Sequence, residues 1–201
     1  MRIGLFGGSF DPVHLGHLWT AESALEQLSL DEVRWIPAAQ SPLKASPPIA
    51  SDEQRLMMIR LAIGGTPRHV VDTRELSRKE ISYTVRTVEE ICEKNPDNEY
   101  FFIAGSDSLA SMPDWYMPEK ILGLVTLSVV NRGGNLPPDY SVLNGIVDPQ
   151  SINRIKESEI KMPAIEVSSS AIRDRIKRGR SVRYQVPHAV TAYLDAEKIY
   201  C

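Results

Sequence analysis

Short apolar runs alternate along this chain with segments in which apolar residues recur at helical spacing. Most of the runs lack a polar residue at every second position, which is typical of strands covered on both faces. We therefore expect six buried strands. They span residues 3–6, 33–36, 69–71, 100–104, 125–130 and 164–167.

The segments with helical spacing predict five helices. Ser51 and Gln54 form a capping box at the start of one of them. Strands that alternate with helices predict an α/β protein with a mostly parallel sheet, helices on both faces and right-handed connections. A ligand of such a sheet lies beyond the carboxyl ends of the strands. The expected helices cover residues 15–28, 51–63, 83–93, 171–177 and 187–198.

Three long loops interrupt this alternation. Residues 37–50 contain four prolines, residues 74–81 are highly charged, and residues 132–138 hold two glycines and two prolines. In a compact domain such loops are often functional, but a plain surface connection is an equally good interpretation of any one of them.

Length and composition narrow the class of protein. With 201 residues the chain predicts one domain, residues 1–201, in which 168–201 form a C-terminal helical subregion. A net charge of −3 without a charge block weighs against nucleic acid and anionic membranes as partners, although local basic sites stay open. The chain has no apolar run of about 20 residues and only two cysteines, Cys92 and Cys201, so we expect a cytoplasmic protein.

The run GGSFDPVHLGH at residues 7–17 follows the first strand and begins the first helix. We expect Gly7 and Gly8 to let the backbone approach a ligand and to adopt positive φ angles. Backbone N–H groups at the helix N-terminus then face an anion. Gly16 costs up to about 1 kcal/mol of helix stability relative to alanine, and a ligand lying against that turn would explain it.

His14 and His17 are spaced i, i+3 and share one helix face. Either protonation state can donate a hydrogen bond to a phosphate oxygen. Two isolated histidines are more often partly buried surface residues, but the strand–glycine–helix context favours phosphate binding.

This run lacks both common phosphate-loop patterns, G-x-G-x-x-G and G-x-x-x-x-G-K-[ST]. It resembles the G-x-F-D-x-x-H-x-G-H signature of the nucleotidylyltransferase superfamily. The resemblance implies a Rossmann-like parallel sheet of the nucleotidylyltransferase type. It also implies that the histidine pair is catalytic and contacts a nucleoside triphosphate. The ATP-binding residues that it implies in this segment are Gly7, Gly8, Ser9, Phe10 and Gly16.

A second segment, VSSSAIR at residues 167–173, follows an expected strand and begins a helix. Ser168 or Ser169 is a candidate N-cap, and Arg173 could hold the outer phosphates of a triphosphate. Seen alone, the segment is better interpreted as a capped helix with a solvated arginine. It resembles the I-S-S-T-x-I-R motif of adenylyltransferases in the superfamily, which implies ATP binding by Ser168, Ser169 and Ser170 and a catalytic Arg173.

Two sister families share both motifs, the phosphopantetheine and the nicotinate-nucleotide adenylyltransferases. The middle of the chain resembles the second family, in its S-Y-T segment at residues 82–84, its G-x-D-x-L strand end at 105–109 and its W-Y pair at 115–116. The resemblance covers nearly the whole chain.

The same resemblance assigns an acceptor site. Trp115 can stack on a pyridine ring, unless it is ordinary core, and backbone N–H groups near Thr84 and Tyr116 can bind a ring carboxylate. Arg132 matches an arginine of the family's substrate loop, although a solvated role is nearly as good an interpretation. Gly105 and Asp107 lie at a strand end, where Asp107 can accept hydrogen bonds from ribose hydroxyls and both join the ATP-binding set.

The chain departs from the family after the second strand, where many members carry P-N-x-x-P-P-H-K. Residues 37–44 are PAAQSPLK here, so Ala39 and Leu43 replace the usual polar residues. Only Lys44 keeps the basic character, and a lysine can still attract phosphate as a point charge. We add Lys44 alone to the ATP-binding set.

The resemblance implies an adenylyltransferase that uses ATP, with Mg²⁺, and nicotinate mononucleotide to form deamido-NAD and pyrophosphate in NAD biosynthesis. The four histidines and two cysteines are scattered apart from the His14 and His17 pair, so we expect no protein metal site. Nicotinamide mononucleotide as acceptor, a phosphopantetheine adenylyltransferase and a non-catalytic nucleotide-binding module remain alternatives. The sequence leaves a homo-oligomer open.

Overall fold

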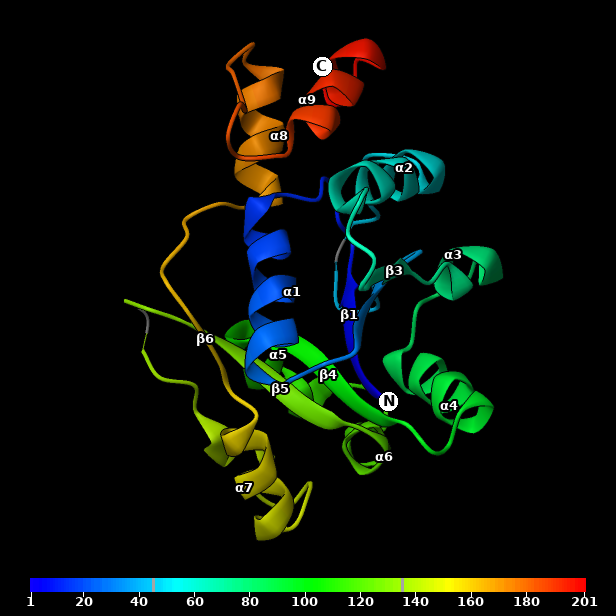
Figure 1. Cartoon of the computed structure of the whole chain (residues 1–201), viewed down its shortest axis with the longest axis vertical. Helices are drawn as coiled ribbons and strands as arrows, with labels where there is room; N and C mark the ends of the chain where they lie inside the picture. Colours follow the sequence, from blue (N-terminus) through cyan, green and yellow to red (C-terminus); the bar gives the residue numbers. More distant parts are fainter. Residues whose placement is uncertain (45, 135) are drawn as a thin grey trace.

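The computed structural model describes residues 1–44, 46–134 and 136–201. Six parallel strands form one sheet in the order β3-β2-β1-β4-β5-β6, so the expected α/β class with a parallel sheet is confirmed (Figure 1). Residue 45 of the predicted loop 37–50 and residue 135 of the predicted loop 132–138 lie outside the described residues. The strands are β1 (Arg2–Gly8), β2 (Glu32–Pro37), β3 (His69–Val71), β4 (Glu99–Gly105), β5 (Thr126–Arg132) and β6 (Ile160–Met162).

The last strand is the one that the sequence places wrongly. β6 ends at Met162, and no strand forms over the predicted residues 164–167. Pro163 follows Met162 directly and has no N–H group to donate to a ladder, so it ends the pairing with Val130–Arg132 of β5. The expected apolar run is instead the connection from β6 to the next helix.

The five predicted helices form, with ends that differ by a few residues, and four further helices were missed. The predicted capping box at the start of α2 is present, since the Ser51 hydroxyl accepts from the Gln54 N–H and the Ser51 N–H donates to the Gln54 side chain. Helix α3 lies within residues 74–81, which the sequence predicts as a loop. The helices are α1 (Leu15–Gln27), α2 (Asp52–Ile63), α3 (Arg74–Arg78), α4 (Thr84–Lys94), α5 (Ser106–Ala110), α6 (Pro118–Leu124), α7 (Pro149–Glu157), α8 (Ser169–Lys177) and α9 (His188–Ala196), with 3₁₀ turns at Met112–Asp114 and Tyr140–Leu143.

Helices cover both faces of the sheet. One hydrophobic cluster packs α1, α2, α8 and α9 against one face, and a second packs α4, α6 and α7 against the other. Helices α8 and α9 lie together at the end of the molecule where α1 begins, and the C-terminus lies there too (Figure 1). Because Ile172, Val190 and Leu194 belong to the first cluster, this C-terminal segment shares its core with the sheet.

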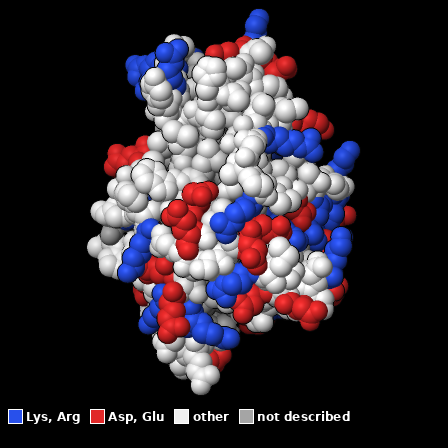
Figure 2. All heavy atoms as spheres, viewed as in Figure 1, with Lys and Arg blue, Asp and Glu red and all other residues white. Residues whose placement is uncertain are grey.

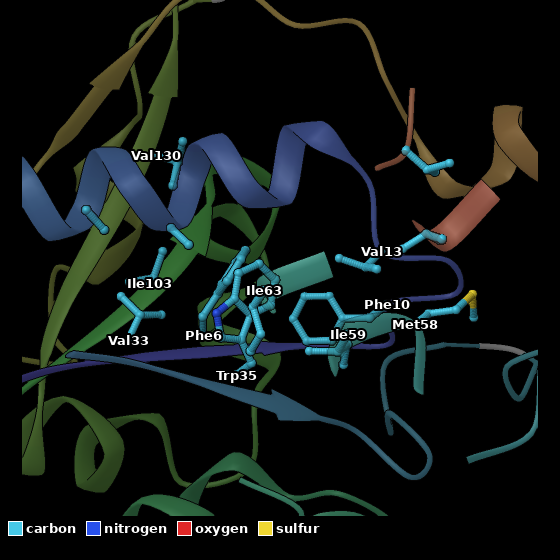
Figure 3. Packing of buried hydrophobic residues seen from close by; sticks show 14 of the residues in the cluster. Phe6, Phe10, Val13, Val33, Trp35, Met58, Ile59, Ile63, Ile103 and Val130 are labelled. Carbon is cyan, nitrogen blue, oxygen red and sulfur yellow. The ribbon is translucent and has the colours of Figure 1, made fainter. Parts of the chain in front are cut away.

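An aromatic group fills the first cluster beneath the end of β1 (Figure 3). Phe6 and Phe10 lie with their ring centroids 5.1 and 5.3 Å from Trp35, in edge-on or tilted arrangements. Such pairs contribute about 0.5–1.5 kcal/mol each beyond the area that they bury. The packing anchors Phe10, and with it the start of the segment that leads to α1.

Candidate active site

The sheet reverses its strand order between β1 and β4, and ligands of open α/β sheets bind beyond the carboxyl ends of the strands at such a point. Two cavities lie at this edge. The large cavity, about 670 Å³, is lined by the ends of β1, β2 and β4 and by residues of α4 and of the segment 105–116. The small cavity, about 410 Å³, is lined by residues 132–134 and 164–168.

The β1–α1 turn, residues 9–17, joins the two cavities. Ser9 lines the large cavity, while Gly16 lies against the Val167 carbonyl of the small one. The expectation of positive φ at Gly7 and Gly8 is wrong, because both lie in β1 and the left-handed residue is Phe10, with φ 47°. A Cβ on Gly8 would come within 3.1 Å of the Phe10 ring, so Gly8 makes room for that ring.

The two histidines of the turn stack on each other. Their ring centroids are 3.7 Å apart and the ring planes differ by 24°. The backbone N–H of His14 donates to Nδ1 of the His17 ring at 3.2 Å. The neutral His17 ring therefore carries its proton on Nε2 and is a donor there. A Cβ on Gly16 would lie 3.1 Å from the His14 ring. The His14 ring is thus one reason for a glycine at position 16, and a ligand against this turn stays a prediction.

Both imidazoles are neutral at neutral pH. Burial lowers the pKa of His14 from 6.5 to about 4, and the positive charge of Arg132 adds to the effect. Burial likewise holds the pKa of His17 well below its ordinary value, followed by the charges of His14, Arg132 and Lys44. A bound polyphosphate would raise both pKa values, because a nearby anion favours the protonated form. Nδ1 of His14 is buried and has no partner among the described residues.

Asp11 connects four segments, which the sequence analysis did not foresee. Its buried carboxylate accepts from the N–H groups of Ile49 and Ala50 at 2.8 and 3.0 Å and from the Tyr200 hydroxyl at 2.6 Å. Arg173 of α8 lies 3.7 Å from the same carboxylate. The turn, the segment before α2, α8 and the C-terminal segment therefore meet at one side chain.

Helix α8 is fastened to the turn by its first residues. Ser168 is the N-cap, since its hydroxyl accepts from the Ala171 N–H at 3.2 Å, whereas the Ser169 hydroxyl donates to the Pro12 carbonyl at 2.8 Å. The Arg173 guanidinium donates to the Asp11 carbonyl at 2.6 Å. It also donates to the Ser170 hydroxyl at 3.4 Å. The structure thus brings the second predicted motif onto the first.

Cations surround Ser9 at the start of the turn. Lys44 donates to the Ser9 hydroxyl at 2.9 Å, and the fully buried Arg55 donates to the Ser9 carbonyl at 2.7 Å. Burial lowers the pKa of Lys44, the charge of Arg173 lowers it further, and Asp11 opposes the shift. Arg55 is a residue that the sequence analysis missed. Because Arg55 is paired with Asp52 at 2.6 Å, Lys44 is the cation of this pair that can meet an anion.

The predicted acceptor residues Thr84, Trp115 and Tyr116 line the large cavity together, and so do Gly105 and Asp107. Trp115 is half-buried, with its ring edge-on to Phe102 at 5.8 Å. Its indole N–H donates to the Ser111 hydroxyl at 3.2 Å. An exposed aromatic face beside the N-terminus of α4 suits a flat ring that carries negative charge.

Arg132 is not brought to this group, because it lines the small cavity together with Ser168. Its charge nevertheless lowers the pKa of both His14 and His17, so it lies near the turn. Among the described residues no group of three or more histidine, cysteine, aspartate or glutamate side chains could hold a metal ion.

The visible surface carries mixed charge. Lysine and arginine are interspersed with aspartate and glutamate over the lower part of the molecule in Figure 2, while the part over α2 and α9 is mostly uncharged. The helices that the structure describes are all too short or too polar to cross a membrane.

Comparison with known proteins agrees with this geometry. The sequence profile of the cytidylyltransferase-like family matches residues 5–175. The "probable nicotinate-nucleotide adenylyltransferase" of Rhodopirellula baltica is 55% identical over 98% of this chain and 92% of its own length. The protein of the same description from Thermus thermophilus is 41% identical, and the match covers 100% of both chains.

Among solved structures, nicotinic acid mononucleotide adenylyltransferase of Plasmodium falciparum, complexed with NaAD, superposes with a TM-score of 0.77. That match covers 99% of this chain and 97% of the other at 17% sequence identity, so it shows a common fold. The nearly complete matches to relatives far above 30% identity show more than a fold. The chain belongs to the cytidylyltransferase-like family and, within it, to the nicotinate-nucleotide adenylyltransferases, and it is a nucleotidyltransferase enzyme.

Proposed function

We propose that this enzyme transfers the adenylyl group of ATP to nicotinate mononucleotide, forming deamido-NAD (nicotinate adenine dinucleotide) and pyrophosphate, a step of NAD biosynthesis. The observation that carries the proposal is the stack of His14 and His17 in a turn that starts at Ser9, in the wall of the Trp115-lined cavity, and passes Gly16, beside the Val167 carbonyl of the second cavity. Two nucleotides fit such a site with their phosphates meeting at the turn.

The reaction needs neither a strong base nor a covalent intermediate. The 5′-phosphate of the acceptor is already ionised near pH 7 and attacks the α-phosphorus of ATP in line. Catalysis then depends on positioning and on stabilising the charge that develops on the phosphate oxygens. His17 is placed for this because its Nδ1 accepts from the His14 backbone, which leaves the proton on Nε2 for donation.

The triphosphate lies along the β1–α1 turn in this proposal. Arg173 and Lys44 hold its outer phosphates together with His14, and Arg132 lies near enough to meet a phosphate bound at the histidines. The backbone and side chains of the two motifs complete the ATP site: Gly7, Gly8, Ser9, Phe10, Gly16, Gly105, Asp107, Ser168, Ser169 and Ser170.

A divalent cation, Mg²⁺ in our proposal, enters with ATP. The donor set fits a metal that the substrate carries, because the Asp11 carboxylate of the turn is bonded to Ile49, Ala50 and Tyr200 and the described residues hold no group of acidic, histidine or cysteine side chains for a metal. When bound with ATP, such an ion would supply positive charge that offsets the charge of the phosphates. The residues of this chain meanwhile orient the two nucleotides and exclude water.

The pyridine ring of the acceptor lies on Trp115 in the large cavity. In this proposal the backbone N–H groups of Thr84 and Tyr116, which both line the cavity, face its ring carboxylate. Thr84 begins α4, and the first amides of a helix have no acceptor within that helix. A carboxylate gains more from such donors than a carboxamide does. We therefore propose nicotinate mononucleotide as the preferred acceptor.

Pyrophosphate release tests the proposal. The purified protein is assayed with ATP and Mg²⁺ and, in turn, with nicotinate mononucleotide, nicotinamide mononucleotide and phosphopantetheine. We expect the first acceptor to give the highest kcat/KM. A preference for phosphopantetheine would replace the proposed reaction with that of the sister family. ATP binding without pyrophosphate release on any of the three acceptors would remove it.

A further inference from the structure

A buried carboxylate in the wall of the large cavity has no part in the reaction described above. Glu75 of α3 is 7% exposed and lines the cavity beside Ser82, Thr84 and Thr87. Burying a carboxylate is unfavourable unless hydrogen bonds or opposite charges compensate. The groups that bind this carboxylate therefore indicate which part of the structure it stabilises.

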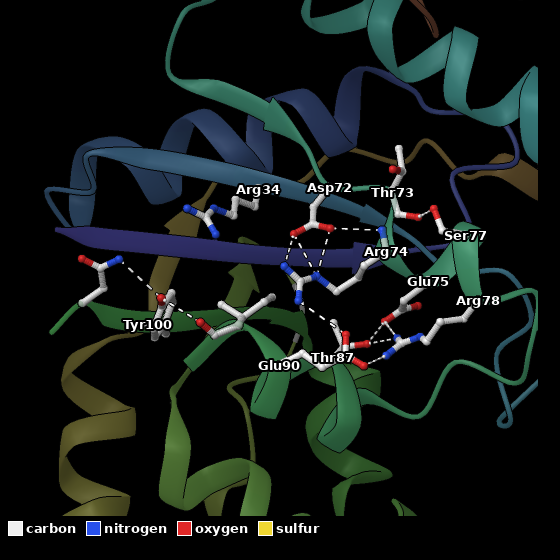
Figure 4. A network of polar contacts seen from close by, with 12 residues as sticks. Arg34, Asp72, Thr73, Arg74, Glu75, Ser77, Arg78, Thr87, Glu90 and Tyr100 are labelled. Atoms are coloured by element: carbon white, nitrogen blue, oxygen red, sulfur yellow. Dashed lines mark hydrogen bonds and ion pairs between the residues drawn. The ribbon is translucent and has the colours of Figure 1, made fainter. Parts of the chain in front are cut away.

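The carboxylate of Glu75 binds hydroxyl groups on both sides of the N-terminus of α4. Oε1 accepts from the Thr87 hydroxyl at 2.6 Å (Figure 4). The pKa of Glu75 is raised by its burial, and the nearby Ser82 hydroxyl opposes that shift by favouring the charged form. Ser82 in turn accepts from the Ala39 N–H at 3.0 Å, so the network extends to the end of β2.

Arg78 compensates part of the charge of this carboxylate. Arg78 lies 4.0 Å from Glu75 and also donates to Thr87 and, at 2.8 Å, to Glu90 (Figure 4). Burial raises the pKa of Glu75, whereas the two hydroxyl bonds and Arg78 lower it. The Glu75 carboxylate thus acts as a hydrogen-bond acceptor, with hydroxyl groups and one guanidinium around it.

Helix α4 lacks a cap of its own. Its N-cap residue is Tyr83, whose side chain makes no capping hydrogen bond. Ser82 lies one position before the N-cap, and Thr87 lies in the first turn of α4. The two residues that interact with Glu75 therefore flank this uncapped end. Thr84, the first residue of α4, lines the cavity, so the position of its backbone depends on the bonds to Glu75.

We propose that Glu75 is a positioning residue for the acceptor: through Ser82 and Thr87 it sets the first turn of α4 so that its N–H groups meet the ring carboxylate. This inference rests on the proposed function of the large cavity. It assigns Glu75 no contact with ATP and no proton transfer, so its loss affects one substrate only.

Glu75→Gln tests this, because the amide keeps the shape of the side chain but supplies one acceptor oxygen where the carboxylate has two. We expect KM for nicotinate mononucleotide to rise about tenfold, with KM for ATP changed less than about twofold. The preference for nicotinate over nicotinamide mononucleotide should fall as well, because the lost geometry serves the ring carboxylate.

Glu90→Gln is the matched control. Glu90 pairs with Arg74, Arg78 and Arg86 in the same network but does not line the cavity. We expect that variant to keep both KM values. A second pair covers the case in which Glu75→Gln does not fold: Thr87→Val removes the hydroxyl and should raise the acceptor KM, whereas Thr87→Ser restores it.

The outcomes separate the inference from the function on which it rests. If the wild-type protein forms no product with nicotinate mononucleotide, the proposed function fails. If the wild type is active but Glu75→Gln and Thr87→Val leave the acceptor KM unchanged, or raise both KM values equally, then Glu75 is not a positioning residue. Equal effects of Glu75→Gln and Glu90→Gln would also overturn the inference.

Discussion

The β1–α1 turn and the large cavity lie side by side at the carboxyl edge of the sheet, but the chain builds them in different ways. The turn is one continuous segment, and its two stacked histidines both come from residues 9–17, although Lys44 and Arg173 reach it from elsewhere in the chain. The large cavity draws its lining from residues 38–44, 75–88 and 102–121 as well as from β1. A function carried by one segment leaves one dense motif in the sequence, whereas a function assembled from several segments leaves only short, separate ones such as residues 82–84 and 115–116.

The two regions also differ in how firmly they are held. Polar groups of the turn, such as Asp11, are buried and bonded to distant segments. The large cavity presents aromatic side chains that are partly free, and Tyr116 is 61% exposed. Changes in the turn should therefore affect turnover or stability strongly, while changes in the cavity should affect the acceptor alone.

The largest expected effect is that of His17→Ala in the turn. Removing a donor to the α-phosphate should lower kcat by roughly 10²–10³, because such donors act mainly on the transition state. Steady-state pyrophosphate release measures it, and thermal unfolding checks the fold. His188→Ala, at an exposed histidine of α9, should leave kcat unchanged. Wild-type turnover in the His17 variant would remove this residue from the mechanism.

Asp11→Asn should mainly reduce stability. An amide at this position offers one acceptor oxygen and places an NH₂ group against the N–H donors of Ile49 or Ala50. We expect a loss of about 2–3 kcal/mol in the free energy of unfolding, measured by urea denaturation. The exposed Asp97→Asn is the control and should change stability little. Equal stability of the two variants would show that the contacts of Asp11 are energetically unimportant.

The lowered pKa of His14 predicts a pH dependence of stability. Unfolded, the side chain takes up a proton near its ordinary pKa of 6.5, whereas in the folded protein it does so only near 4. Between these values the unfolded state binds more protons, so stability falls as the pH drops. His14 alone should lower the free energy of unfolding by about 2 kcal/mol between pH 7 and pH 5.

Urea unfolding of His14→Asn at both pH values measures that effect. The variant should lose less stability than the wild type on going from pH 7 to pH 5, although His17 still contributes in the same direction. His188→Asn should keep the wild-type slope. A slope in His14→Asn as steep as that of the wild type would show that His14 is not held neutral by burial.

Trp115→Ala gives the smallest of these effects and is confined to the cavity. Losing the stacking face should raise KM for the pyridine nucleotide about tenfold, or about 1.4 kcal/mol, with KM for ATP nearly unchanged. Initial rates with each substrate varied in turn provide the test. Trp19→Ala, at a half-exposed tryptophan of α1, is the control. An equal rise of both KM values would point to general damage of the loop.

The sheet was predictable because its central strands are continuous apolar runs between turn residues. Helices α1, α2 and α4 were predictable from their apolar periodicity. Helix α3 was not, since ion pairs of Arg74 and Arg78 hold it rather than an apolar stripe. Helix α7 could have been found, because Asp148 caps it and Pro149 occupies its first position.

The candidate site divides in the same way. His14 and His17 were identified from their spacing within one turn, and the structure stacks them there. Arg55, Glu75 and Tyr200 carry no local signal, because their importance lies in partners far along the chain. Asp11 stood inside the motif, but only the fold shows that four segments converge on it.

The hydrogen bond between Tyr200 and Asp11 constrains when the site can form during synthesis of the chain. Its two ends are 189 residues apart in the chain. At about 5–20 residues per second, a ribosome needs about 10–40 s to make the stretch between them. Throughout that time β1 and the two histidines that follow it are already synthesised, but Asp11 cannot yet bond to Tyr200. In a newly synthesised molecule, the ability to bind ATP should therefore come only after residue 200 has been made, when all six strands have already been synthesised.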